Sequence, residues 1–237
     1  MVNVLTVASR KGGVGKSTIA YEVAYELDAI LLDLDWDAGA VSPAWGYRHE
    51  ARATDAMMSA IEHGRTPRVL SGFRKPRLVP GSPDLVDAHF SAQEWSDLIS
   101  TWAQAWGSEW IVIDTHPGVT EPGNGAMSLS NLILSPFALR TKEMAAVEQI
   151  VAEMADYPLA VVPNFVPPIP PAAELRRLQA IIAGTPVQVT PFIPNVNKIG
   201  TRKRRMAMCA ETPTPRAYQP AVDRYRAIAE FARGYVK

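Results

Sequence analysis

The stretch that decides the fold is ASRKGGVGKSTIA, from Ala8 to Ala20. Its three glycines, at positions 12, 13 and 15, allow the backbone to turn its N–H groups toward an anion, and Lys16 and Ser17 follow directly. An apolar run, Val2–Ala8, precedes this loop, and apolar residues at helical spacing over Ser17–Leu27 follow it. A strand, a glycine-rich loop and a helix in this order predict a phosphate-binding loop.

Composition restricts the class of protein. The chain has 237 residues, of which 47% are hydrophobic and 20% are charged, so we expect one globular domain over residues 1–237. No apolar run approaches the roughly 20 residues of a membrane span, and the first strand begins without a basic leader, so we expect a cytoplasmic protein. Cys209 is the single cysteine and the four histidines are scattered, so any metal site must use oxygen ligands.

Apolar runs and helical patterns alternate along the rest of the chain. The continuous apolar runs predict strands at Ile30–Asp35, Trp110–Asp114, Leu132–Phe137, Leu159–Pro163 and Val187–Ile193. Helices are expected at Thr54–His63, Ser91–Trp106, Lys142–Ala155, Ala172–Ala183 and Gln219–Tyr235. This alternation predicts an α/β fold with a doubly wound, mainly parallel sheet flanked by helices, whose ligand lies beyond the carboxyl ends of the strands.

The residues of the loop have separable tasks. We expect backbone amides around Gly12, Gly13 and Gly15 to bind phosphate oxygens, Lys16 to lie near the β and γ phosphates, and Ser17 to bind Mg²⁺. The usual pattern, G-x-x-x-x-G-K-[ST], has a glycine where this chain has Arg10. The loop is therefore a variant of the common phosphate-binding loop.

KGGVGKST, with Lys11 before the glycines, resembles the deviant Walker A motif of the ParA/MinD family of ATPases. The resemblance implies ATP and Mg²⁺ as cofactors and an ATP-bound homodimer in which Lys11 reaches the phosphates of the partner subunit. The alternative is that Lys11 is a solvated loop residue. The resemblance also implies catalytic roles for Lys11, Lys16 and Asp35, and a nucleotide site made of Lys11, Gly12, Gly13, Val14, Gly15, Lys16, Ser17, Thr18, Asp114, Asn164 and Pro194.

Four further segments resemble the same family. In LLDLDWDAGAVS, Leu31–Ser42, Asp35 corresponds to the residue that positions the attacking water, and Asp33 lies near the metal. IVIDTHPG, Ile111–Gly118, resembles Walker B and switch II, so Ser17, Asp33 and Asp114 are the expected Mg²⁺ residues. In LAVVPNFV, Leu159–Val166, and PFIPN, Pro191–Asn195, the resemblance implies that Asn164 and Pro194 border the adenine.

The cargo is a separate question, because fold does not determine it. Residues 198–237 carry ten basic and three acidic side chains, a net charge of +7, and include the run Arg202, Lys203, Arg204 and Arg205. We expect these four residues to contact the phosphates of non-specific DNA, although a solvated basic face is the alternative. The chain is most similar to small ParA partition proteins without an N-terminal helix-turn-helix domain, which implies a ParB-like partner, slow ATP turnover and association with the nucleoid.

A MinD-like membrane-associated positioning ATPase is the rival interpretation. It would require the last helix, Gln219–Tyr235, to place its apolar face in a bilayer. That segment is rich in alanine and poor in leucine, so we expect it to pack on the sheet instead.

Overall fold

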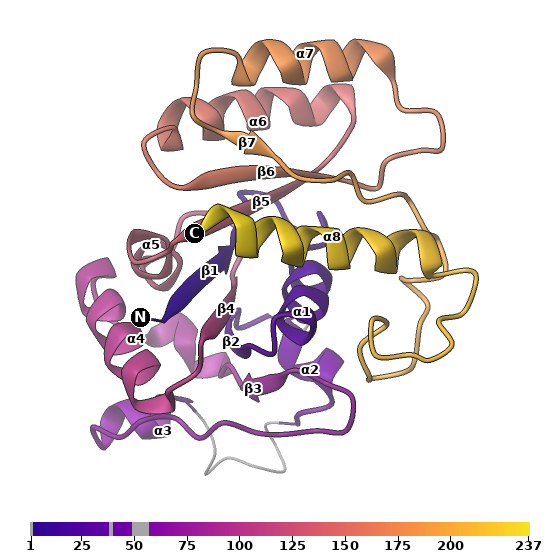
Figure 1. The fold of residues 1–237 in the computed structure, drawn as a ribbon. Coiled ribbons are helices and arrows are strands. Elements are labelled where there is room, and N and C mark those ends of the chain that lie inside the picture. Colours follow the sequence, from indigo (N-terminus) through magenta and orange to yellow (C-terminus); the bar gives the residue numbers. More distant parts are fainter. Residues whose placement is uncertain (1, 38–39, 49–56) are drawn as a thin grey trace.

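The strands of the protein form one seven-stranded sheet in the order β3-β2-β4-β1-β5-β6-β7, and all neighbouring strands are parallel (Figure 1). The structure is a computed structural model that describes residues 2–37, 40–48 and 57–237. The strands are β1 (Asn3–Val7), β2 (Ile30–Leu34), β3 (Arg77–Val79), β4 (Trp110–Thr115), β5 (Leu132–Ala138), β6 (Leu159–Asn164) and β7 (Gln188–Val189). The sheet confirms the predicted α/β class.

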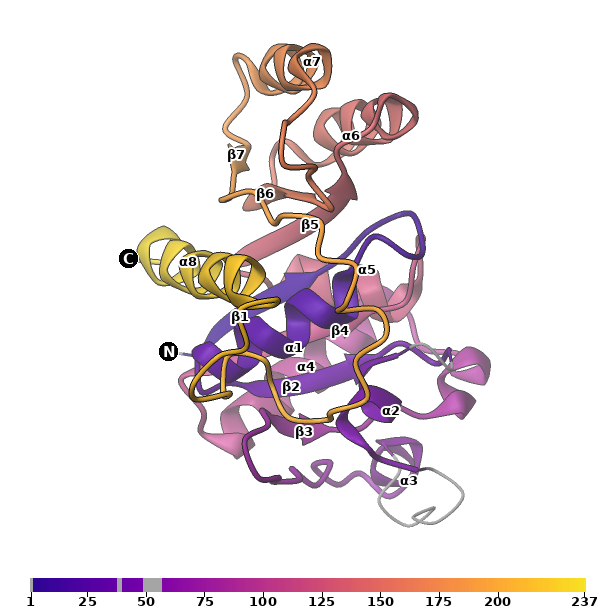
Figure 2. The ribbon, with the colours of Figure 1, turned by 90° about the vertical axis from the view of Figure 1, so that its right-hand side faces the viewer.

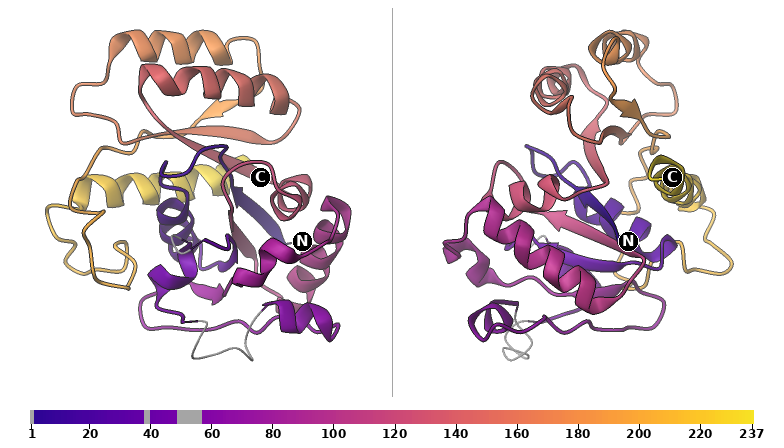
Figure 3. Two further views of the ribbon diagram at one scale, coloured as in Figure 1. Left: turned by 180° about the vertical axis from the view of Figure 1, so that it is seen from behind. Right: turned by 60° about the vertical axis from the view of Figure 1, so that its left-hand side comes forward.

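Helices cover both faces of the sheet (Figure 3). Buried side chains of α1 and α8 pack on one face and those of α4 on the other, while α6 and α7 pack near β5 and β6. The helices are α1 (Lys16–Glu26), α2 (Val41–Trp45), α3 (Met57–Glu62), α4 (Ala92–Trp106), α5 (Glu121–Ser128), α6 (Thr141–Met154), α7 (Ala172–Ile182) and α8 (Gln219–Tyr235), with a 3-10 helix, η3, at Pro83–Asp87.

Strand register places the glycine-rich loop beside the ends of two other strands. Val7 of β1 pairs with Asp114 of β4, and Asp33 of β2 pairs with the same Asp114. Because parallel strands run in one direction, their carboxyl ends meet at one edge of the sheet. The loop that follows β1 therefore lies next to the aspartates that end β2 and β4.

Two predicted elements differ from the structure. The strand expected at Val187–Ile193 is wrong in length, because β7 contains only Gln188–Val189. Beyond it, Pro191 and Pro194 have no N–H group for a regular ladder, and single bonds such as Ile193 N to Pro163 O, 2.9 Å, continue beside β6. The helix predicted at Thr54–His63 is described only as α3, because residues 54–56 lie outside the described ranges.

Helix α5 was not expected, since its sequence EPGNGAMS contains a proline and two glycines. Its N-cap Thr120 accepts a hydrogen bond from the Gly123 N–H, which stabilises the first turn. A Cβ atom at Gly125 would lie 2.5 Å from the Ala92 carbonyl oxygen and 2.6 Å from the Trp95 Cβ of α4. The glycine therefore allows α5 to pack directly on α4, a tertiary requirement that helix propensity does not reveal.

The last helix packs inside the protein, as expected. Buried residues of α8 belong to the same apolar cluster as α1, and they are Ala221, Val222, Tyr225, Ile228, Ala229 and Ala232. Arg226 and Arg233 bind Glu26 at the end of α1 through its carboxylate and its backbone carbonyl, respectively. Among the described helices, none combines the length and the apolar character that a membrane span requires.

Candidate nucleotide site

The glycine-rich loop has a conformation that requires glycine at its end. Gly15 caps α1 with a φ of 91°, and Gly13 has a φ of 75°, both in the left-handed region. A Cβ atom at Gly15 would lie 2.3 Å from the Asn164 Nδ2, whereas one at Gly13 would meet no atom within 4 Å. Gly15 is therefore constrained by its backbone and by a neighbour, and Gly13 by its backbone alone.

Asn164 supports the loop from the end of β6. Its Nδ2 donates to the Val14 carbonyl oxygen at 2.8 Å, its Oδ1 accepts from the Phe165 N–H at 2.8 Å, and the residue is buried. Pro194 forms a bridge with Val166, so the two predicted adenine neighbours lie on adjacent segments. Their contact with adenine stays a prediction, and the structure adds a positioning role for Asn164.

Asp114 is the carboxylate best placed for a metal. The residue is fully buried at the end of β4, and neither carboxylate oxygen has a hydrogen-bond partner among the described residues. Burial raises the pKa of Asp114 well above its ordinary value, the charge of Asp33 raises it further, and the Ser17 side chain and Lys16 ammonium oppose the shift. A buried, unpartnered carboxylate beside the Ser17 hydroxyl offers the hard oxygen ligands that Mg²⁺ requires.

Both carboxylate oxygens of Asp33, the residue predicted to lie near the metal, already accept hydrogen bonds from the protein. Its Oδ2 accepts from the Ser42 N–H at 2.8 Å and from the Ser42 hydroxyl, and its Oδ1 accepts from the Asp35 N–H at 3.1 Å. Burial raises the pKa of Asp33 to about 7 against the effect of these bonds. A Cβ atom at Gly81 would lie 2.7 Å from the Asp33 carbonyl oxygen, so the turn after β3 also depends on a glycine.

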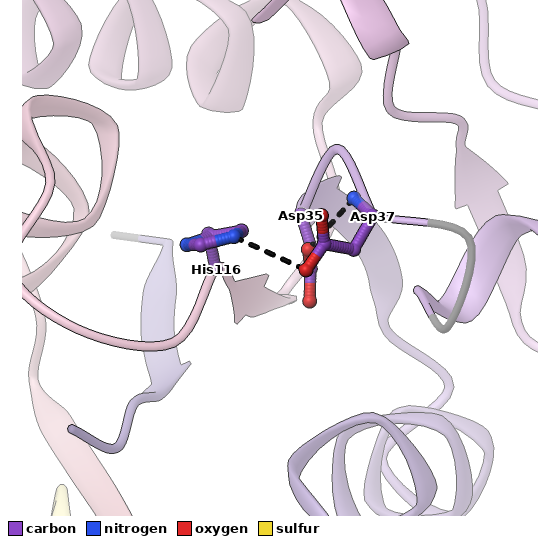
Figure 4. A group of neighbouring side chains, drawn as sticks. All are labelled: Asp35, Asp37 and His116. Atoms are coloured by element: carbon purple, nitrogen blue, oxygen red, sulfur yellow. Dashed lines mark hydrogen bonds and ion pairs between the residues drawn. The ribbon is translucent and has the colours of Figure 1, made fainter. Parts of the chain in front are cut away.

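Asp35 belongs to a cluster that joins the segments after β2 and β4 (Figure 4). Ligand atoms of Asp35, Asp37 and His116 lie within 4.8 Å of one another, and His116 Nε2 is 3.3 Å from Asp37 Oδ2. The Trp36 ring stacks on His116 with centroids 3.9 Å apart. Burial raises the pKa of Asp35, while the Asp37 N–H and the charge of Lys16 lower it. The cluster could hold a divalent cation.

The two cations at the start of the loop contact α6. Lys11 Nζ lies 2.8 Å from the Glu143 Oε2, and its side chain is 46% exposed. Arg10 forms an ion pair with Glu153. Lys11 therefore has a partner within its own chain, so it is not an unpaired loop lysine, and its role toward a second subunit stays a prediction.

The predicted basic run divides into one inward and three exposed residues. The Arg202 side chain is 10% exposed, donates to Glu211, and binds the carbonyl oxygens of Arg204 and Met206. Lys203, Arg204 and Arg205 are exposed. A cavity of about 340 Å³ separates this run from Ser17 and Thr18 at the start of α1. The structure thus gives Arg202 a structural task. Arg204 also reaches Glu211, at 3.0 Å, but its side chain stays 68% exposed, and Lys203 and Arg205 are exposed as well.

Similar proteins agree with the architecture. No protein-family model matches the sequence, and no curated protein matches it. McdA from Cyanothece is 16% identical, with a TM-score of 0.77 over 99% of this chain and 100% of that chain. A plasmid partition protein from Borrelia burgdorferi, bound to AMPPNP, is 17% identical, with a TM-score of 0.74 over 99% and 100%. MinD from Aquifex aeolicus is 16% identical, with a TM-score of 0.73 over 98% and 97%.

The chain has the fold of the ParA/MinD ATPases. At identities of 15–18% the likeness concerns the fold, and the motifs at residues 10–18 and 111–118 are what connect the sequence to nucleotide chemistry. The fold places the glycine-rich loop, Asp33 and Asp114 at one edge of the sheet, and Asp35 follows directly after β2 at the same edge.

Sequence reasoning missed several side chains of the site. Ser42 binds Asp33, and Glu143 binds Lys11 from a position 132 residues away. The stacking of Trp36 on His116 was also missed. No local signal pointed to Glu143.

Proposed function

We propose that the chain is an ATP-dependent DNA partitioning ATPase with slow intrinsic turnover. The observation that carries the proposal is the buried, unpartnered carboxylate of Asp114 facing the end of a glycine-rich loop that begins with Lys11 and ends with Lys16 and Ser17. The fold shared with McdA, a plasmid partition protein and MinD supports it. The nucleotide in the plasmid partition protein from Borrelia burgdorferi supports ATP as the ligand.

Binding of the nucleotide follows from the loop. The backbone N–H groups of Gly12–Thr18 would surround the phosphates, and the ammonium of Lys16, a residue that is 5% exposed, would neutralise part of their charge. Ser17 and Asp114 would hold Mg²⁺, with Asp33 nearby. The bound ion would neutralise phosphate charge and polarise the transferred phosphoryl group.

Asp35 orients the water for hydrolysis in this proposal. The residue is 7% exposed, its Oδ1 accepts the Asp37 N–H at 3.0 Å, and Lys16 lies close enough to lower its pKa. A carboxylate held by a backbone donor can keep one oxygen directed at a water molecule. The contact between His116 and Asp37 holds the same segment from the β4 side.

Lys11 acts across the dimer interface in this proposal. It must leave Glu143, and an ion pair as exposed as this one contributes only about 0–1 kcal/mol. Each Lys11 would then neutralise a second set of phosphates, so ATP favours the dimer over the monomer. We expect Lys11→Ala to bind ATP as a monomer and to lose dimerisation and turnover. Arg10→Ala is the matched control, because its ion pair with Glu153 is also on α6. Normal turnover by Lys11→Ala would remove this role.

The exposed basic residues supply the cargo contact. Lys203, Arg204 and Arg205 would bind DNA phosphates in the ATP dimer, and hydrolysis, stimulated by a ParB-like partner, would release the DNA. The protein would then occupy the nucleoid within the cytoplasm. Equilibrium binding to a non-specific duplex is the direct test, with ATP·Mg²⁺, with ADP and without nucleotide. We expect salt-sensitive binding in the ATP state alone. DNA affinity that is equal in all three states contradicts the proposal.

The membrane alternative has less support. Its amphipathic helix would be α8, and the apolar face of α8 is already buried against α1. A parallel measurement with anionic liposomes distinguishes the two functions. Binding to liposomes without binding to DNA would replace DNA partitioning by a MinD-like positioning function.

A further inference from the structure

A second loop lies beside the basic run, although the two are far apart in the sequence. The Ala207 N–H donates to the Arg74 carbonyl oxygen at 2.9 Å, which joins the basic run to the loop before β3. The Arg205 side chain lies over Gly46, where a Cβ atom would be 2.9 Å from its Cδ. Figure 2 shows the orange segment after β7 passing along α1 and α2 toward β3. Residues 72–75 and 203–205 thus share one surface.

The structure fixes the loop before β3 firmly. Lys75 Nζ donates to the Trp45 carbonyl oxygen at 2.6 Å and lies 4.3 Å from the centroid of the Trp45 ring. A Cβ atom at Gly72 would lie 2.8 Å from the same ring, so the loop packs closely on α2. Burial lowers the pKa of Lys75, and the nearby charge of Arg205 lowers it further. Like charges are therefore held together at this surface.

Phe73 is the unusual member of the surface. It is 78% exposed, among the most exposed large hydrophobic side chains of the described residues, and it stands at the tip of a loop anchored on both sides. The Arg74 guanidinium lies 5.4 Å from its ring centroid, so an aromatic ring and a cation are presented together. A single exposed ring is common on protein surfaces, so the informative feature of Phe73 is its position among the cations Arg74, Lys75 and Arg205.

We propose that this surface, the Phe73 patch, is a contact surface for double-stranded DNA. It consists of Phe73, Arg74, Lys75, Lys203, Arg204 and Arg205. Arg74 and the residues of the basic run contact phosphates, and Phe73 makes an apolar contact with sugars or bases, as wedge residues do in the minor groove. The inference rests on the proposed function and adds residues 73–75, which the sequence did not single out, to the DNA site.

The ratio of cationic to apolar residues in the Phe73 patch favours DNA over a lipid surface. Five of its six residues are cations and one is apolar, whereas insertion into a bilayer depends on a larger apolar face. Glu211 lies underneath, 4% exposed, and is occupied by Arg202 and Arg204. The patch therefore presents positive charge with a single ring, which matches a duplex polyanion whose minor groove admits one apolar wedge between base steps.

The test measures binding of the full chain to a random-sequence duplex with ATP·Mg²⁺ over a series of salt concentrations. We expect Arg74→Ala to weaken binding and to reduce the slope of log K against log [salt] by about one. Phe73→Ala should weaken binding about fivefold or more while leaving that slope unchanged, because it removes an apolar contact and no charge. The Arg74 side chain can be removed without deleting its carbonyl oxygen, which binds Ala207.

Matched controls come from the opposite end of the sheet. Arg176→Ala removes an exposed cation from α7, and Ile169→Ala removes an 87% exposed apolar side chain from the proline-rich loop. Both variants should bind DNA as the unchanged protein does. Thermal melting of each variant establishes that it is folded.

The outcomes separate this inference from the proposed function. If the unchanged protein binds no DNA in any nucleotide state, the proposed function fails. If it binds DNA and Lys203→Ala/Arg204→Ala weakens binding while Phe73→Ala and Arg74→Ala do not, the function stands and the Phe73 patch is wrong. Loss of liposome binding in Phe73→Ala, with DNA binding unchanged, also overturns the inference and assigns the patch to a membrane.

Discussion

Replacing Gly15 by alanine tests how the glycine-rich loop is held. The substitution meets two obstacles, because φ is 91° and the new Cβ atom would lie 2.3 Å from the Asn164 Nδ2. A left-handed alanine costs about 1–2 kcal/mol. Displacing the Asn164 amide breaks its bond to the Val14 carbonyl oxygen and leaves buried polar groups unpaired, at a further cost of about 1–3 kcal/mol. We expect Gly15→Ala to lower the free energy of unfolding by about 2–5 kcal/mol.

Gly13→Ala is the control for the backbone contribution. Its φ is 75°, but no atom lies within 4 Å of the position that the added methyl group would take, so we expect a loss of about 1–2 kcal/mol. Urea denaturation of the protein without nucleotide measures both free energies of unfolding. In an Asn164→Ala background the clash is gone, so Gly15→Ala should then cost no more than Gly13→Ala. Equal losses for the two single variants, or an unchanged cost of Gly15→Ala in that background, would refute the reasoning.

Three further changes have expected outcomes. Burial raises the pKa of Asp33 to about 7 in the folded state and also raises the pKa of Asp114. These carboxyls therefore stabilise the protein at low pH, and this contribution to stability is lost as the pH rises from about 4 to about 7. This contribution should make the melting temperature fall as the pH rises across this range. Asp114→Asn should flatten the dependence of melting temperature on pH and abolish Mg²⁺-dependent nucleotide binding. An unchanged pH dependence in this variant contradicts a raised pKa of Asp114. Asp35→Ala should retain ATP and accumulate dimers by size-exclusion chromatography, and normal hydrolysis would remove Asp35 from the mechanism. Deletion of residues 225–237 removes buried Tyr225 and Ile228, about 3–6 kcal/mol of burial, and should yield aggregate; a soluble folded ATPase would instead indicate a dispensable tail.

The features that could be predicted from the sequence are those that depend on neighbours along the chain. Continuous apolar runs located most of the strands, and parallel order then placed Asp33 and Asp114 at one edge without further information. The glycines of the loop were equally local, because left-handed turns require them at Gly13 and Gly15.

Contacts between distant segments could not be predicted in this way. Arg202 belongs to a run of four cations, yet its side chain turns inward to Glu211 because the chain folds back nine residues later. Helix α5 exists because Gly125 allows close packing on α4, which outweighs its poor helix propensity. Phe73 and Arg74 lie beside the basic run only because β3 is the edge strand next to the returning segment.

The charges of the site connect nucleotide binding to stability. Asp33 and Asp114 are buried as neighbours, with Lys16 as a buried cation close to them, and burial raises the pKa of both carboxyls. A triphosphate placed in the loop would add negative charge to this group, so the phosphates alone are a poor ligand. A divalent cation held by Ser17 and Asp114 would offset the charges of the carboxylates and of the phosphates. Under the proposed function, the site would therefore favour the nucleotide together with Mg²⁺ over the nucleotide alone, and binding would relieve part of the electrostatic cost of burying the two carboxyls together.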